Sequence, residues 1–136
     1  METVLDASIT LTWCFQDERT PKTDVLLEKL ETESAFVPGL WTLEIGNILL
    51  TACRKQRITY ANATEFLSLL NALDIRIDDR YAHYGFHEIF LLAHAEKLTT
   101  YDAAYLELAM REGLPLATKD LQLSEAALRL GVEVIS

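Results

Sequence analysis

Residues 3–8 read Thr-Val-Leu-Asp-Ala-Ser, and this short apolar run stops at one carboxylate before any helix could have formed. The pattern predicts a short buried strand over 3–5 and a brief helix over 8–13. In open α/β sheets, ligands bind in the crevice outside the carboxyl ends of the strands. Asp6 is therefore expected to mark both the end of the first strand and the edge at which a functional site would lie.

The rest of the chain alternates short strand patterns with helical ones. Strands are expected over 3–5, 35–37, 75–77, 116–118 and 132–135. Helices are expected over 8–13, 21–33, 41–54, 62–73, 81–97 and 124–130, with one more from the Thr99-Thr100 cap to Arg111. Short strands between helices predict an α/β sandwich around a mostly parallel sheet. With 136 residues, half of them apolar, the chain fits a single domain over 1–136.

The composition also bears on location and on cysteine chemistry. No run of about 18 apolar residues occurs, and Asp6 interrupts the first apolar run too early for a signal peptide. We therefore expect a soluble, cytoplasmic protein that does not enter a membrane. Cys14 and Cys53 lack the C-x-x-C spacing of a redox or zinc motif, so they are expected to be buried thiols.

The net charge is −9, from 21 acidic and 12 basic residues, which is the wrong sign for a broad phosphate-binding face. A nucleic acid would have to bind locally or through a cation. The acidic surface also suits a basic protein partner or plain solubility, and composition does not separate these alternatives.

Two carboxylates stand where ligand-binding groups are expected at the end of a strand. Asp6 and Asp120 each follow a short apolar run, and Asp78 is a weaker candidate of the same kind. Turn formation is the alternative role for any one of them. A functional role is better supported by two acids that both follow short buried strands than it would be by a single one.

Two further carboxylates lie on predicted helices. Glu44 is set in an almost wholly apolar helix, where a carboxylate needs a partner or a crevice, and no basic residue stands at i+4 to pair with it. Asp102 shares a helix face with Tyr105, whereas Glu107 is expected to face water. An acid in the first turn of a helix also compensates the helix dipole, and this is the alternative role for Asp102.

Four carboxylates at one edge of a sheet would repel each other, and a hard divalent cation among them would relieve the repulsion. Carboxylates and water are the ligands that Mg²⁺ and Mn²⁺ prefer. Such a cation would also bridge an acidic protein to a phosphodiester and activate a water molecule as a nucleophile.

Other kinds of site have weaker support. His83 and His87 are spaced i, i+4, but no third zinc ligand is evident and the H-E-x-x-H motif is absent, so surface or packed histidines are expected. The sequence also contains no Gly-rich phosphate loop and no G-x-S-x-G nucleophile motif.

Four pieces of the chain, in this order and at this spacing, resemble the PIN-domain ribonucleases, and most closely the VapC-type toxins of bacterial and archaeal toxin-antitoxin pairs. The pieces are VLDAS at Asp6, LEIGNIL at Glu44, TTYDAAYLELA at Asp102 and LATKD at Asp120, followed by Leu123 and GVEVI. The resemblance covers nearly the whole chain. It implies a three-layer α/β/α sandwich with a short, mostly parallel sheet, and an endoribonuclease that uses Mg²⁺ or Mn²⁺.

The resemblance also implies roles for particular residues. The catalytic and metal-binding residues would be Asp6, Glu44, Asp102 and Asp120, with Ser8, Asn47 and Thr118 nearby to orient carboxylates or water. Proteins of this kind usually form homodimers and are inhibited by a cognate antitoxin that often inserts an arginine or another side chain into the acidic pocket.

Candidate RNA contacts are less specific. Lys119 stands directly before Asp120, where a small or apolar residue is more usual in the family, so it would contact an RNA phosphate or only be solvated. Arg54 and Arg57 belong to the one dense basic cluster of the chain, and compensation of a helix dipole is their alternative role.

Two alternatives to the nuclease hypothesis remain at this point. A receiver-like phosphoacceptor domain also gathers acids and a lysine around Mg²⁺, although Asp6 is followed by Ala7-Ser8 rather than by a second acid. A PIN-like module that has lost catalysis and only binds a partner is the other alternative.

Overall fold

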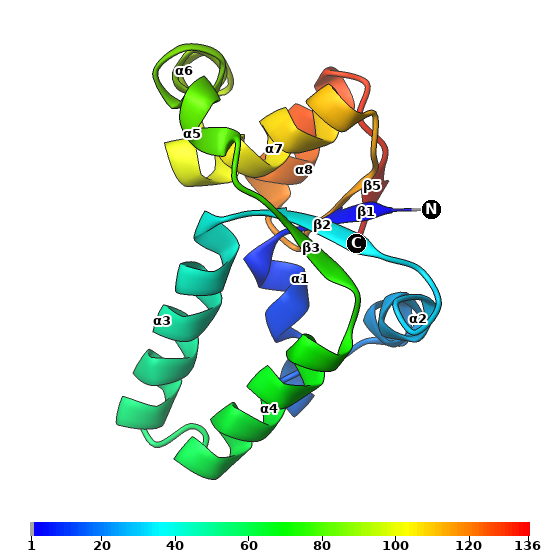
Figure 1. The fold of residues 1–136 in the computed structure, drawn as a ribbon, viewed down its shortest axis with the longest axis vertical. Coiled ribbons are helices and arrows are strands. Elements are labelled where there is room, and N and C mark those ends of the chain that lie inside the picture. Colours follow the sequence, from blue (N-terminus) through cyan, green and yellow to red (C-terminus); the bar gives the residue numbers. More distant parts are fainter. Residues whose placement is uncertain (1) are drawn as a thin grey trace.

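The computed structural model describes residues 2–136 and is built on a five-stranded sheet in the order β3-β2-β1-β4-β5 (Figure 1). All neighbouring strands are parallel, which confirms the predicted sheet. The strands are β1 Thr3–Leu5, β2 Ala35–Pro38, β3 Ile75–Asp78, β4 Leu116–Ala117 and β5 Val134–Ile135. The first strand of the chain is thus the central strand of the sheet.

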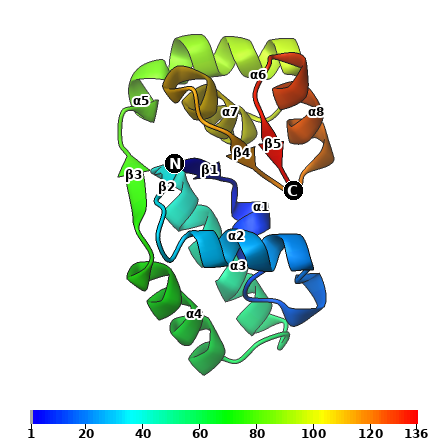
Figure 2. The same ribbon diagram turned by 90° about the vertical axis from the view of Figure 1, so that its right-hand side faces the viewer.

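Helices cover both faces of this sheet, so the molecule has three layers. The helical segments are α1 Ala7–Leu11, η1 Gln16–Glu18, α2 Pro21–Lys29, α3 Leu40–Arg54, α4 Tyr60–Ala72, α5 Tyr81–Tyr84, η2 Gly85–Ile89, α6 Phe90–Glu96, α7 Thr100–Glu112 and α8 Leu121–Arg129. Helices α1 to α4 lie on one side of the sheet and α5 to α8 on the other (Figures 1 and 2). The predicted three-layer α/β/α sandwich is therefore confirmed.

Within residues 2–136, no helix combines the length and the apolar character needed to cross a membrane.

Local signals explain why α7, which lies over the centre of the sheet, begins and ends where it does. The hydroxyl of Thr99 accepts a hydrogen bond from the backbone N–H of Asp102 at 3.1 Å, which caps the first turn. At the other end, Gly113 takes a left-handed conformation with φ of 65°, which a glycine adopts without steric cost. The cap at Thr99 agrees with the prediction from the sequence.

The core joins the two helical layers through the central strand. Val4 and Leu5 are completely buried, and so are Ile9 of α1 and Leu106 of α7 on its two sides. Burying a side chain of this size contributes about 1.5–3 kcal/mol to folding. The core therefore fixes α1 and α7 relative to the carboxyl end of β1.

The segment 81–97 differs from the prediction of one continuous α-helix. Helix α5 passes into the π-helical turn η2 at Gly85, and α6 follows from Phe90. Glycine is a poor α-helix former, and π-helical turns inside helices often lie near functional surfaces. The apolar pattern alone predicted the helix but not this change of pitch.

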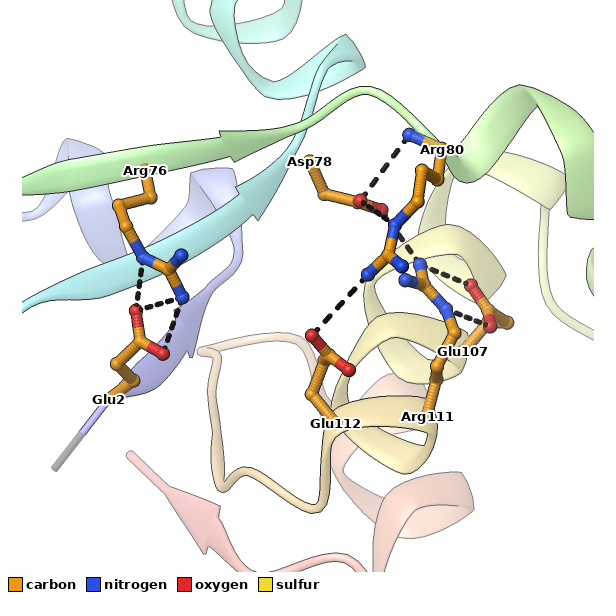
Figure 3. Close-up of polar contacts among 7 residues, drawn as sticks. All are labelled: Glu2, Arg76, Asp78, Arg80, Glu107, Arg111 and Glu112. Atoms are coloured by element: carbon orange, nitrogen blue, oxygen red, sulfur yellow. Dashed lines mark hydrogen bonds and ion pairs between the residues drawn. The ribbon is translucent and has the colours of Figure 1, made fainter.

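A second prediction, that Glu107 faces water, was wrong. Its side chain is buried because Arg111, one turn further along α7, pairs with it at 2.8 Å. Arg111 also bonds Asp78 at the end of β3, at 2.7 Å (Figure 3). This ion-pair network, to which Arg80 adds a contact with Glu112 at 3.5 Å, ties α7 to an edge strand of the sheet.

Candidate metal centre

Asp6 stands at the carboxyl end of β1, where the chain passes directly into α1, and it is only 5% exposed. One of its carboxylate oxygens, Oδ2, accepts hydrogen bonds from the hydroxyls of Ser8 and Thr118, both at 2.7 Å. Those two hydroxyls lie 3.3 Å apart. The side chain of Asp6 is therefore held in one orientation by residues from two neighbouring strand ends.

The strand order explains why these residues meet. From β1 the chain builds β2 and β3 on one side of the sheet and then β4 and β5 on the other, so the order reverses between β1 and β4. A crevice at such a switch point is where open α/β sheets bind ligands. Asp6, Thr118 and Asp120 all lie at this point.

Asp120 follows β4 and has a second role that the sequence did not predict. Its Oδ1 accepts a hydrogen bond from the N–H of Leu123 at 2.8 Å, so Asp120 is the N-cap of α8, which begins at Leu121 rather than at Ser124 as predicted. Its own N–H donates to the Thr118 hydroxyl at 3.0 Å. The cap uses one carboxylate oxygen.

Glu44 enters the site from α3, in the helical layer that also contains α1. It is half-buried, and it accepts a hydrogen bond from the phenol of Tyr105 in α7. One turn earlier in α3, the indole N–H of Trp41 donates to the hydroxyl of Thr10 at 3.2 Å. Helix α3 is thus held against α1 by one bond and against α7 by the other.

The electrostatics of the four acids are coupled. Burial raises the pKa of Asp6, and the charge of Asp120 adds to this, while hydrogen bonds from Thr118 and Ser8 oppose it. Burial raises the pKa of Glu44, and Asp6 and Asp102 raise it further against the effect of the Tyr105 hydrogen bond. For Asp102, burial and repulsion from Asp6 and Asp120 raise the pKa to about 6. Each acid is therefore within electrostatic reach of at least one other.

The chemistry of this site fits a hydrated hard cation better than a closed cage of protein ligands. Within residues 2–136, no group of three or more His, Cys, Asp or Glu side chains is arranged to hold a metal ion. Mg²⁺ usually keeps several waters and binds through one or two carboxylates, and a cation would relieve the repulsion that raises these pKa values. Thiolate and imidazole ligands, which zinc favours, do not contact the four acids in the hydrogen-bond network described above.

Four other predicted site residues have exposed side chains. Asn47 is exposed on α3, one turn after Glu44, and Arg54 is exposed ten residues after Glu44, about 15 Å along the helix. Arg57 pairs with Asp17 at 3.0 Å and also with Glu18, and it stacks on the ring of Phe15. Lys119 is exposed beside Asp120, and its N–H donates to Ser8 at 2.9 Å.

Asp78 and the histidines can be placed as well. Burial opposes the charge of Asp78, but hydrogen bonds from Arg111 and Arg80 outweigh it and hold its pKa below the ordinary value. Asp78 is thus part of the ion-pair network, not of the acidic site. His83 and His87 are exposed, as expected of surface histidines.

An open parallel sheet between two helical layers, with acids at its switch point, defines an α/β protein with a candidate cation site. The chain belongs to the PIN domain family, whose model matches residues 3–128. This match removes the receiver-like alternative.

Solved structures show the same fold. PAE2754 from Pyrobaculum aerophilum is 24% identical, with a TM-score of 0.71 over 99% of this chain and 91% of that one. VapBC2 from Rickettsia felis, bound to a DNA fragment from their promoter, is 13% identical, with a TM-score of 0.68 over 98% and 97%. FitAcB from Neisseria gonorrhoeae is 18% identical, with a TM-score of 0.62 over 98% and 96%. No curated protein has a significantly similar sequence.

Proposed function

We propose that the protein is an endoribonuclease that depends on Mg²⁺ or Mn²⁺, and that it is the toxin of a toxin-antitoxin pair in the cytoplasm. The observation that carries the proposal is that Asp6 and Asp120 from neighbouring strand ends and Glu44 and Asp102 from two helices gather at one edge of the sheet, where the pKa values of Asp6, Glu44 and Asp102 are raised. PIN domains are nucleases and generally use divalent metal ions. VapBC2 and FitAcB, which share the fold, are toxin-antitoxin pairs.

The acids Asp6, Glu44, Asp102 and Asp120 would surround the ion, with one or two of them bound directly and the others reached through its waters. When bound, the ion would supply an activated water and stabilise charge on the leaving oxygen of the phosphodiester. The hydroxyls of Ser8 and Thr118 would keep the Asp6 carboxylate ionised and oriented, because both donate to its Oδ2. Asn47, exposed one turn after Glu44, would orient a water or the substrate.

Two basic side chains are candidates for contact with RNA. Lys119 is exposed beside Asp120, so its ammonium group can approach a phosphate held at the acidic site. Arg54 lies about 15 Å from Glu44 along α3, a distance that a longer RNA would span. Arg57 is a weaker candidate, because Asp17 and Glu18 already neutralise its charge.

The proposal predicts that RNA cleavage and metal binding go together. Millimolar Mg²⁺ or Mn²⁺ should raise the melting temperature of the protein, because a ligand that binds only the folded state stabilises it. Addition of either ion to purified protein and total RNA should produce defined new RNA ends, detected by end sequencing, and a chelator should abolish them. Intact RNA and an unchanged melting temperature with both ions would support the non-catalytic alternative instead.

An apolar groove beside the acids is the surface we propose for homodimer formation. It has a volume of about 440 Å³ and lies between α3, the α5–η2 segment and the start of α7. Its lining includes Leu43, which is 78% exposed, and Phe86, which is 94% exposed. Contiguous exposed apolar side chains of this kind mark interaction surfaces on proteins in general.

The antitoxin, in turn, would have to present basic groups to an acidic protein with a net charge of −9.

Replacing Phe86 with aspartate should convert the dimer into a monomer. The charge would have to be buried in the apolar interface, which costs several kcal/mol without a partner. Light scattering during size-exclusion chromatography measures the mass directly. The control is Leu128→Asp, which changes a 63% exposed side chain on α8, outside the groove, and should leave the dimer intact. A wild-type monomer at micromolar concentration, or a dimer that survives Phe86→Asp, would exclude this interface.

A further inference from the structure

Tyr105 is completely buried, yet its side chain ends in a polar group at the acidic site. It lies on the inward face of α7, one turn after Asp102, and its phenol donates a hydrogen bond to Oε1 of Glu44 in α3. Burial raises the pKa of Tyr105, and the hydrogen bond to Glu44 raises it further, so the phenol stays protonated and acts as a donor.

This bond is the main polar contact of Glu44. Within residues 2–136, Glu44 takes part in no ion pair, and burial favours its neutral form. A hydrogen bond to a carboxylate favours the charged form and restricts the rotation of the group. Because the phenol occupies Oε1, the other oxygen of Glu44 is the one left to meet an ion.

The backbone around Glu44 is fixed by separate contacts. Trp41, one turn earlier, is tied to Thr10 of α1, and Thr10 in turn donates to the backbone carbonyl of Asp6 at 3.0 Å. These bonds set where α3 lies relative to Asp6, but they do not set the side-chain orientation of Glu44. That orientation depends on Tyr105.

We infer that Tyr105 is a positioning residue for the metal site, in that its hydroxyl orients the Glu44 carboxylate so that one oxygen faces Asp6 and Asp102. The inference rests on the proposed function, because it assigns Glu44 as a ligand. A buried tyrosine usually finds some hydrogen-bond partner, and a role limited to packing is the competing explanation. The packing role needs the ring alone, whereas positioning needs the hydroxyl.

The test is the affinity for Mn²⁺, measured by calorimetry and by the electron paramagnetic resonance signal of free Mn²⁺. Tyr105→Phe should weaken binding by about 10- to 100-fold, the usual effect of removing a group that orients a metal ligand. Tyr60→Phe, which removes a hydroxyl from a 74% exposed tyrosine at the start of α4, should leave the affinity unchanged. Melting curves of the metal-free variants check that each is folded.

The double variant separates positioning from packing. If Tyr105 acts through Glu44, then Tyr105→Phe should add little to the loss already caused by Glu44→Gln. Wild-type binding that is lost in Glu44→Gln but kept in Tyr105→Phe would overturn the inference and leave the proposed function standing. A Tyr105→Phe loss that simply adds to that of Glu44→Gln would also overturn it. Wild-type protein that binds no Mn²⁺ would overturn the proposed function, and the inference with it.

Discussion

If the protein is the proposed ribonuclease toxin, replacement of Asp6 with asparagine is expected to abolish RNA cleavage, with a rate loss of about 10²–10³-fold or more, and to abolish any growth arrest caused by expression of the wild-type protein. Asparagine has nearly the same shape and can still accept the hydrogen bonds from Ser8 and Thr118, but it lacks the charge that would bind a cation. Because Asp6 is only 5% exposed and burial raises its pKa, removing this charge should not lower the melting temperature of the metal-free protein. Single-turnover cleavage and a melting curve measure the two effects.

The matched control for this variant is Asp79→Asn. Asp79 is an exposed aspartate just after β3, so the control makes the same substitution at the end of another strand, away from the acidic site. It should keep the wild-type cleavage rate. An Asp6→Asn protein that is folded and cuts RNA at the wild-type rate would remove Asp6 from the site.

The sequence was sufficient to predict the sheet and the places of its acids. A short apolar run that ends in a carboxylate predicts a buried strand with the acid at its carboxyl end. Parallel strands bring these ends to the same edge of the sheet. Asp6 and Asp120 could therefore be placed near each other although they lie 114 positions apart in the sequence. The raised pKa values of Asp6, Glu44 and Asp102 agree with the predicted repulsion, whereas a role of these residues in binding metal stays a prediction.

What the sequence could not predict depends on contacts between distant elements. The hydrogen bond from Tyr105 to Glu44 joins residues 61 positions apart, and it exists only because α3 and α7 approach each other around the carboxyl end of β1. The one available signal was the i+3 spacing of Tyr105 from Asp102, which placed both on the inward face of α7. Nothing in the local pattern named Glu44 as the partner.

The same limit applies to two charged residues whose partners the sequence did not reveal. Helical periodicity placed Glu107 toward water, but Arg111, which also pairs with Asp78, neutralises Glu107 and keeps it buried in an ion-pair network. Similarly, Arg57 was a candidate RNA contact on sequence grounds, and Asp17 and Glu18 engage it in the structure. Charge patterns indicate that a residue needs a partner, whereas the fold decides which partner it has.

Replacing Asp102 with asparagine is expected to stabilise the metal-free protein at pH 7 while it abolishes cleavage. Burial and repulsion from Asp6 and Asp120 raise the pKa of Asp102 from 3.8 to about 6, so its charged form is disfavoured in the folded state. That shift corresponds to at most about 3 kcal/mol, and about 1–2 kcal/mol after allowance for the half-buried side chain. The favourable interaction of Asp102 with the start of α7 is smaller, at about 0.3–1 kcal/mol. The net gain is therefore about 0.5–1.5 kcal/mol, and the melting temperature should rise by about 2–6 °C.

The pH dependence identifies the cause of this stabilisation. Between pH values of about 4 and 6 the folded wild-type protein binds more protons than the unfolded chain, so its free energy of unfolding falls as the pH rises through this window. The gain from Asp102→Asn should be fully present above about pH 6 and absent below about pH 4 in the presence of a chelator. With saturating Mg²⁺ the order should reverse, because only the wild-type protein gains stability from binding. A gain that persists at pH 4, or no gain at pH 7, would mean that Asp102 does not carry the repulsion from which a metal site is proposed at this edge of the sheet.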